Sequence, residues 1–300
     1  MILSPAKLNL SLRVNNILKN GYHSISSYVL FLDLFDKLFI RNSSQNRVEV
    51  HGRFKNDLVN NGGDTIISKS LSFCQKYSHY NDKLNIILEK NIPVSAGLGG
   101  GSANSASILR YCLLKKDQKE NKISNEVIKL SSLLGSDVPA CLYSKPLLME
   151  GMGEKITFIH FNNNLNIGVV LINPKTQLST EKVFKSFVLR KSTVKKKSIL
   201  KINTIRDVVD VCELGNDLEK PAIKIVPEIL NIFNMFKLND ECLCYGMSGS
   251  GATCYGIFHS RKKANDFKKK IIKKIKHKNY WIWSGGFLNK KKFDFTSIIK

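Results

Sequence analysis

The stretch IPVSAGLGGGSANSASIL, residues 92–109, carries four glycines in the five positions 97–101. It follows a strand-like run (83–93) and passes into a run of small and apolar residues (102–116) that indicates a helix. Glycine lets the main chain turn tightly or approach another group closely. Where such a turn enters a helix, unpaired N–H groups and the helix dipole face an anion. We therefore predict a phosphate-binding loop; a flexible connector or a tight packing turn is the alternative.

The loop fits neither of the two common phosphate-binding patterns. It lacks the lysine of G-x-x-x-x-G-K-[ST], and Ser102 stands where G-x-G-x-x-G has its last glycine. The signature motifs of protein kinases are also missing from the sequence. Ser102 falls in the first turn of the predicted helix, where a hydroxyl can bind a phosphate or a phosphate-bound Mg²⁺. The spacing of the glycines therefore predicts a phosphate site that belongs to neither of these two classes.

Two ionisable residues are candidates for the chemistry of phosphoryl transfer. The reaction needs a group that accepts or orients the proton of the nucleophile, and positive charge near the transferred group. Asp137 lies in LGSDVPACL (134–142), between a predicted helix end and Pro139, and Lys7 lies at the start of the alternating run KLNLSL. Taken singly, each also fits an ordinary surface or turn residue.

The composition indicates a globular protein with room for one large domain or two ordinary ones. The chain has 300 residues, of which 43% are hydrophobic and 24% charged. It contains no apolar run long enough for a membrane span and no basic region ahead of an apolar stretch at its start. Seven scattered cysteines are typical of buried thiols in a reducing compartment. We expect a cytoplasmic protein without a membrane partner.

The formal net charge of +23 raises the possibility of an anionic partner. The lysines gather in the segments 190–201, 261–278 and 289–292. In the middle segment, Phe267 and Ile271 recur at helical spacing, so the lysines there fit the solvated face of an amphipathic helix. We expect surface charge without a nucleic-acid partner; a basic nucleic-acid-binding protein is the alternative of a different class.

Strand-like and helix-like runs alternate irregularly along the chain, which favours an α+β fold. Strands are predicted at 8–15, 25–34 and 37–42, and residues 136–159 are predicted to form a turn followed by a hairpin. The asparagine-rich segment 161–166 is the most loop-like connection. We therefore predict two domains, residues 1–160 and 161–300.

Five motifs in this order resemble the GHMP family of small-molecule kinases. They are PAKLNLSL (5–12), GYHSI (21–25), P-x-x-x-GLGGGSANSA (93–106), LGSDVP (134–139) and MSGSGA (247–252). The resemblance extends from Pro5 to about Gly286. It implies two α+β lobes with the active site between them, an ATP-binding N-terminal lobe and a ferredoxin-like C-terminal lobe. It also implies ATP and Mg²⁺ as the requirements of the reaction.

The resemblance implies roles for residues in the five motifs. Asp137 would accept the proton of the substrate hydroxyl, and Lys7 would hold that hydroxyl and offset its developing negative charge. Ser102 is the candidate Mg²⁺ ligand, and the segment 247–252 would support the phosphate loop. The loop residues implied to contact ATP are Pro93, Val94, Ser95, Ala96, Gly97, Leu98, Gly99, Gly100, Gly101, Ser102 and Ala103.

The motif GYH, which follows the first strand, further resembles members of the family whose substrate carries a cytidine diphosphate group. Tyr22 would stack on the cytosine and His23 would bind its edge, while Thr180 and Phe184 match the spacing of the other base contacts. Asn9, on the same strand face as Lys7, would contact the polyol part of the substrate. A kinase of the homoserine or mevalonate type is the rival within the family. The adenine contacts stay unassigned, and a monomer and a homodimer remain equally open.

Overall fold

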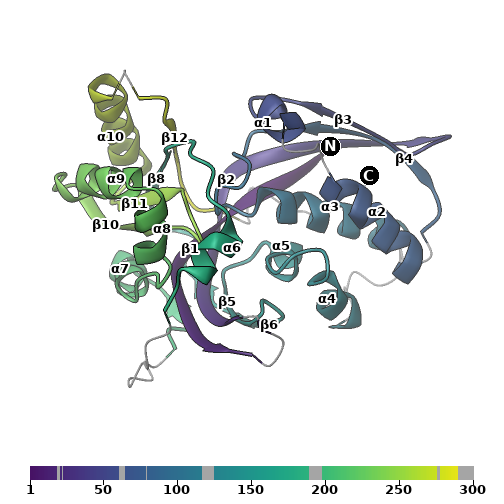
Figure 1. Ribbon diagram of the computed structural model, residues 1–300, viewed down its shortest axis with the longest axis horizontal. Helices are drawn as coiled ribbons and strands as arrows, with labels where there is room; N and C mark the ends of the chain where they lie inside the picture. Colours follow the sequence, from purple (N-terminus) through teal and green to yellow (C-terminus); the bar gives the residue numbers. More distant parts are fainter. Residues whose placement is uncertain are drawn as a thin grey trace.

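The computed structural model describes residues 1–18, 21, 23–60, 65–78, 80–116, 125–188, 198–275 and 278–289. Figure 1 shows the N-terminal half of the chain, purple to teal, beside the C-terminal half, green to yellow. Each half combines a β-sheet with helices. The predicted α+β class is confirmed.

The N-terminal half is built on a mixed sheet with the strand order β3-β4-β2-β5-β6, and β1 pairs with β2 beside this path. The strands are β1 (Ile2–Ile17), β2 (His23–Ser43), β3 (Arg47–His51), β4 (Lys83–Glu89), β5 (Leu147–Gly151) and β6 (Lys155–Phe158). β1 and β2 form a long antiparallel pair, whereas β3 and β4 run parallel. The long pair places Lys7 on β1 opposite Phe31 on β2.

The strand β2 is longer than the sequence predicted. Two strands were expected at 25–34 and 37–42, but the structure has one strand of 21 residues. The two predicted strands left out Phe35 and Asp36. Asp36 is buried and accepts hydrogen bonds from other segments, so the ladder continues through it.

Helices cover the N-terminal sheet. They are α1 (Lys55–Asn60), α2 (Thr65–Ser78), α3 (Gly100–Lys116), α4 (Asn125–Ser131) and α5 (Val138–Tyr143). Small side chains let α3 approach its neighbours closely: the Ser105 hydroxyl lies 2.7 Å from that of Ser70 on α2, and the Ser107 hydroxyl lies 2.8 Å from that of Ser4 on β1. The segment predicted as a turn before the hairpin contains the short helix α5, and the β5–β6 hairpin follows as predicted.

The C-terminal half contains a four-stranded antiparallel sheet with the order β10-β11-β8-β12. Its strands are β8 (Gly168–Asn173), β10 (Cys242–Met247), β11 (Cys254–Phe258) and β12 (Trp281–Gly285). Along the chain, helices separate β8 from β10 and β11 from β12. This β-α-β-β-α-β order with the first strand in the interior is the ferredoxin-like arrangement, as predicted.

The described residues of this half form the helices α6 (Thr180–Lys185), α7 (Ile205–Glu213), α8 (Glu219–Ile225), α9 (Glu228–Lys237) and α10 (Arg261–Lys274). The sequence analysis did not identify α7, α8 and α9. α7 begins with a capping box in which Thr204 and Asp207 exchange hydrogen bonds. α10 buries Ala264, Phe267 and Ile271 while most of its lysines are exposed, so the predicted amphipathic helix is confirmed.

The two sheets pack against each other through alternating side chains of β8. Val169 and Leu171 face the core shared with β1 and β2, whereas Val170 and Ile172 face the core under α8, α9 and α10. The Tyr255 hydroxyl on β11 donates a 2.6 Å hydrogen bond to the Leu10 carbonyl on β1. The shared core fixes the position of one half against the other.

The segment after β12 returns to the N-terminal sheet. The Asp33 amide donates to the Gly286 carbonyl at 3.1 Å, the Leu288 amide donates to the Phe31 carbonyl at 2.8 Å, and Arg261 forms an ion pair with Asp33. The short strands β7 (His160–Phe161) and β9 (Lys201–Ile202) pair in parallel beside the predicted domain boundary at residue 160, which stays a prediction. Within the described ranges, no helix is long and apolar enough to cross a membrane.

Candidate active site

A cavity of about 770 Å³ lies where the two halves meet. Its walls come from β1, the glycine-rich segment, the start of α5, α6 and the turn between β10 and β11. The labels of β1, α3, α5 and α6 all lie near the centre of Figure 1. The predicted site residues that line the cavity are Lys7, Asn9, Pro93, Val94, Ser95, Ala96, Gly97, Gly99, Gly100, Gly101, Ser102, Asp137, Thr180 and Phe184.

The glycine loop is held close to two other parts of the cavity wall. Gly97 and Gly99 adopt φ angles of +74° and +62°, which favour glycine. A Cβ atom on Gly97 would overlap the Ser248 carbonyl oxygen, and one on Gly99 would lie 2.6 Å from Lys7 Cγ. The Ser248 hydroxyl also donates to the Gly97 carbonyl at 2.9 Å. The prediction that the segment 247–252 packs against this loop is confirmed.

Two loop residues that the sequence analysis included do not line the cavity. Leu98 is buried in the core between the sheets, and Ala103 is buried in the core under the N-terminal helices. Each packs the loop against the scaffold from behind. The main chain of Leu98 still contributes, because its carbonyl accepts a 3.0 Å hydrogen bond from the Lys7 amide.

Lys7 and Asp137 form an ion pair inside the cavity, with Lys7 Nζ 3.1 Å from Asp137 Oδ2. The Lys7 side chain is 4% exposed and that of Asp137 is 24% exposed. Asp137 is the N-cap residue of α5, but its side chain makes no capping hydrogen bond. Its carboxylate contacts Lys7 and lines the cavity instead. Residues 130 positions apart therefore supply one cation and one anion to the same wall.

Asn9 connects this pair to the turn between β10 and β11. Its side-chain oxygen accepts a hydrogen bond from Lys7 Nζ, and its Nδ2 donates to the Ser27 hydroxyl at 2.7 Å. The Asn9 amide donates to the Ser248 hydroxyl at 3.1 Å. Ser27 was not predicted, because only the pairing of β2 with β1 brings it beside Asn9.

Phe184 on α6 lines the cavity and belongs to a group of three aromatic rings whose other members, the predicted His23 and Phe187, do not line it. The rings of His23 and Phe184 have centroids 4.9 Å apart, and Phe187 meets His23 edge-on at 6.2 Å. The Thr180 and Ser250 hydroxyls lie 2.8 Å apart. Tyr22, the other predicted ring, lies outside the described residues. Phe187 was missed, although it follows Phe184 by three positions in FKSF.

Ser102 lines the cavity in the first turn of α3, beside the turn that carries Asp137. A Cβ atom on Gly135, two residues before Asp137, would lie 3.5 Å from the Ser102 hydroxyl. Hydroxyl and carboxylate oxygens are the donors that Mg²⁺ prefers, and Mg²⁺ commonly takes its remaining ligands from phosphates and water. The donor types fit this ion. The part of the chain that is described holds no cluster of three or more His, Cys, Asp or Glu side chains suited to a metal.

Three residues that the sequence analysis missed extend the cavity beyond the loop. Leu58 from α1, Ile66 from α2 and Lys90 after β4 line it. Ile66 lies beside the start of α3, since a Cβ atom on Gly101 would meet its Cγ2 at 3.8 Å. α1 was not predicted, so no sequence signal placed Leu58 in this wall.

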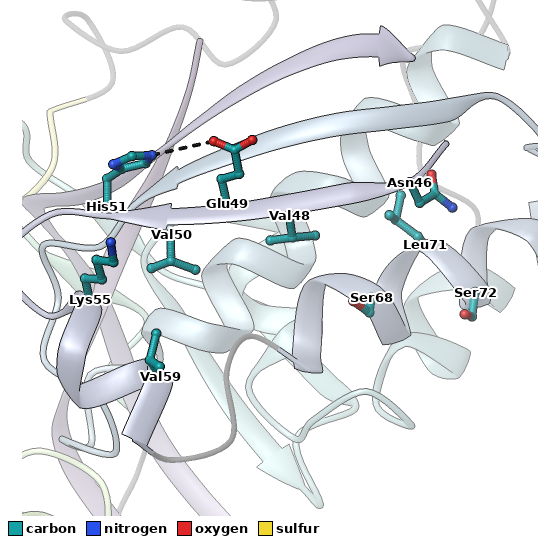
Figure 2. Close-up of a pocket in the computed structure, with 10 residues that line it drawn as sticks. All are labelled: Asn46, Val48, Glu49, Val50, His51, Lys55, Val59, Ser68, Leu71 and Ser72. Carbon is teal, nitrogen blue, oxygen red and sulfur yellow. Dashed lines mark ion pairs between the residues drawn. The ribbon is translucent and has the colours of Figure 1, made fainter. Parts of the chain in front are cut away.

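A second cavity, of about 710 Å³, lies between β3 and the helices α1 and α2. Figure 2 shows Val48 and Val50 pointing from β3 towards the helices, while Glu49 and His51 lie on the opposite side of the strand. His51 Nε2 lies 3.9 Å from Glu49 Oε2. Among the predicted site residues that the structure describes, none lines this cavity. The candidate active site is therefore the cavity that contains Lys7 and Asp137.

Two protein-family models match this chain. Residues 65–145 match the family model of the GHMP kinases N terminal domain, and residues 199–277 match that of the GHMP kinases C terminal. The chain belongs to the GHMP kinases.

Within that family, the similarity points to one enzyme. The chain is 31% identical over 281 residues to the 4-diphosphocytidyl-2-C-methyl-D-erythritol kinase of Parvibaculum lavamentivorans, a match that covers 92% of this chain and 94% of the relative. It is 35% identical over 272 residues to the protein of the same name from Rhizobium leguminosarum bv. trifolii, covering 87% and 86%.

Two solved structures share the fold. A crystal structure of 4-(cytidine 5'-diphospho)-2C-methyl-D-erythritol kinase superposes with a TM-score of 0.70 at 22% identity, covering 95% of this chain and 98% of that one. The homoserine kinase of Cytophaga hutchinsonii superposes with a TM-score of 0.65 at 14% identity, covering 96% and 94%. The predicted GHMP kinase fold is confirmed.

Proposed function

We propose that this chain is an ATP-dependent kinase that phosphorylates the 2-hydroxyl of 4-diphosphocytidyl-2-C-methyl-D-erythritol, a step of the non-mevalonate route to isoprenoid precursors. The observation that carries the proposal is the Lys7–Asp137 ion pair beside the glycine loop in one cavity. The similarity of nearly the whole chain to kinases named for that substrate supports the choice of acceptor.

The glycine loop is proposed to hold the phosphates of ATP. Loop N–H groups and those of the first turn of α3 have no partner within the helix and can converge on phosphate oxygens. Gly97 and Gly99 permit the close backbone path that this requires. The apolar side chains of Leu58 and Ile66, beyond the loop, form a wall suited to the adenine base.

Asp137 and Lys7 are proposed to act on the acceptor hydroxyl. Asp137 Oδ takes the hydroxyl proton as the hydroxyl oxygen forms its bond to the γ-phosphorus. The bond from that phosphorus to the bridging oxygen breaks at the same time, and ADP leaves. Lys7 stabilises the negative charge that grows on the oxygens. Asn9 fixes the ammonium by accepting its hydrogen bond.

Mg²⁺ is proposed to accompany ATP at Ser102, whose hydroxyl would lie 3.5 Å from a Cβ atom on Gly135 in the turn before Asp137. When bound, it would neutralise charge on the phosphates. Ser102 and Asp137 would hold it from the protein side. The glycine loop and Lys7 would orient the phosphates of ATP.

The aromatic group is proposed to bind the cytosine of the acceptor. Phe184 lines the cavity and packs on His23, whose ring nitrogens can bond the base edge. Tyr22 is proposed as a second stacking ring. Two π faces with a few hydrogen bonds select a flat, neutral base, and this distinguishes a cytidyl acceptor from homoserine or mevalonate.

The position of the new phosphate tests the proposed geometry. The enzyme, Mg·ATP and the acceptor would be incubated together, and the product examined by ¹³C NMR for splitting by ³¹P. C2 of the erythritol carries no hydrogen, so we expect the phosphorus to split the signals of C2 and of the carbons bonded to it. A phosphate on another hydroxyl would contradict the placement of Asp137 beside the 2-hydroxyl.

A further inference from the structure

A buried carboxylate, that of Asp36 on β2, lies behind the glycine loop and has no part in the proposed chemistry. Its side chain is 0% exposed. A carboxylate in such a place is costly unless donors surround it. The hydrogen-bond partners of Asp36 therefore indicate its role.

Four hydrogen-bond donors converge on the two oxygens of Asp36. Oδ2 accepts from Lys90 Nζ at 2.6 Å and from Asn104 Nδ2 at 3.0 Å. Oδ1 accepts from the backbone amides of Asn91 at 2.7 Å and Ile92 at 2.8 Å. Both oxygens are thus fully engaged.

The donors come from the two ends of the phosphate loop. Residues 90–92 lead into the loop from β4, and Asn104 lies one turn inside α3, where the loop ends. We propose that Asp36 is a positioning residue for ATP, a clasp that closes the base of the loop and so fixes the directions of its N–H groups. The proposal rests on the proposed function only in taking this loop as the site of the nucleotide phosphates.

The charge of Asp36 also holds an ammonium beneath the start of α3. Lys90 Nζ lies 2.9 Å from the position that a Cβ on Gly100 would occupy, so the ion pair packs directly against the main chain of the loop. Removing one partner of such a buried pair leaves an uncompensated charge. An asparagine at position 36 would turn its NH₂ group towards two of the four donors in either orientation.

Ser4 offers a matched control. It pairs with Asp36 across the β1–β2 ladder and is equally buried. Its hydroxyl contacts Ser107, which lies about one turn beyond Asn104 on α3. Ser4→Ala therefore removes a buried link between the sheet and α3 without touching the loop.

The test measures binding of the nonhydrolysable analogue AMP-PNP with Mg²⁺ to the full chain by calorimetry, with no acceptor present. Asp36→Asn is expected to weaken binding by at least ~10-fold, because two of the four bonds that close the loop are lost. Asn104→Ala removes one neutral donor and is expected to weaken binding about threefold. Ser4→Ala should bind like the wild type even where its thermal midpoint falls.

Equal affinity of Asp36→Asn and the wild type would overturn the proposal. The proposal would also be overturned if all three variants bound AMP-PNP more weakly in proportion to their loss of stability. If Asp36→Asn does not fold, the affinities of Asn104→Ala and Ser4→Ala are compared instead. Weaker binding by Asn104→Ala alone supports the proposal, and equal binding by both variants overturns it. Because no acceptor is needed, a failure to phosphorylate the proposed acceptor would count against the proposed function and leave this test intact.

Discussion

Lys7 Nζ on the first strand lies 3.1 Å from Asp137 Oδ2 at the start of α5, and both side chains line the cavity that the glycine loop borders. A cation and an anion held this close beside the glycine loop can orient a hydroxyl and receive its proton. The pair depends on long-range packing, because β1 and α5 both contact α3.

Asp137→Asn should lower kcat by at least ~10²-fold while the KM values for ATP and acceptor change little. The amide keeps the size of the side chain but cannot take the hydroxyl proton. Steady-state kinetics with both substrates varied would measure this. Near-normal turnover would show that the carboxylate is not the base.

Gly99→Ala should reduce kcat/KM for ATP by about 10²-fold, because its Cβ would lie 2.6 Å from Lys7 Cγ and displace the ammonium. Gly215→Ala is the matched control: Gly215 also has a positive φ, +75°, but no atom lies within 4 Å of its added Cβ. Both variants should lose about 1 kcal/mol of stability to backbone strain. Equal kinetics for the two variants would show that contact with Lys7 does not matter.

Phe184→Ala should raise the KM for the cytidyl acceptor by about 10-fold and leave the KM for ATP unchanged. The change removes the ring that packs on His23 inside the cavity. Phe158→Ala, on β6 and outside the cavity, controls for the loss of an aromatic ring. Parallel increases in both KM values would refute a role confined to the acceptor.

Glu219 predicts a pH-dependent stability. Burial raises the pKa of this carboxyl to about 7, although the Met247 amide donates to it. The folded state then holds a proton that the unfolded state releases near pH 4.5, so stability falls as pH rises from about 4.5 to 7 and is level above. The loss should be on the order of 3 kcal/mol.

Glu219→Gln should abolish this dependence, since its amide is neutral at every pH and can still accept from the Met247 amide. Urea unfolding at pH 5.0 and pH 7.5 would measure the difference. A wild-type midpoint that rises between these pH values, or one that the variant shares, would contradict the assignment.

Much of the site was predictable because its residues carry local signals. The glycine cluster specifies its own backbone path, and Lys7 and Asp137 lie in motifs of the GHMP kinases. Leu98 and Ala103 could not be told apart from the cavity-lining residues of the loop, since only the packing of the loop shows which side chains turn to the core. The domain boundary and the roles of the site residues stay predictions.

The rest of the site depends on contacts that no local pattern records. Asp36 fell between two predicted strands, and its four donors come from segments more than fifty positions away. Ile66 lines the cavity only because α2 packs beside the glycine loop, and Phe187 meets His23 only because α6 lies beside the start of β2. The helices α7 to α9 were not predicted, although buried residues recur at helical spacing in α7 and α9.

The central claim is the transfer of phosphate from ATP to 4-diphosphocytidyl-2-C-methyl-D-erythritol. Its most direct test is the initial rate of ADP release by the purified chain with Mg·ATP and, in turn, this acceptor, mevalonate, homoserine or galactose. We predict turnover with the cytidyl acceptor alone. Turnover with one of the other three and none with the cytidyl acceptor would contradict the claim.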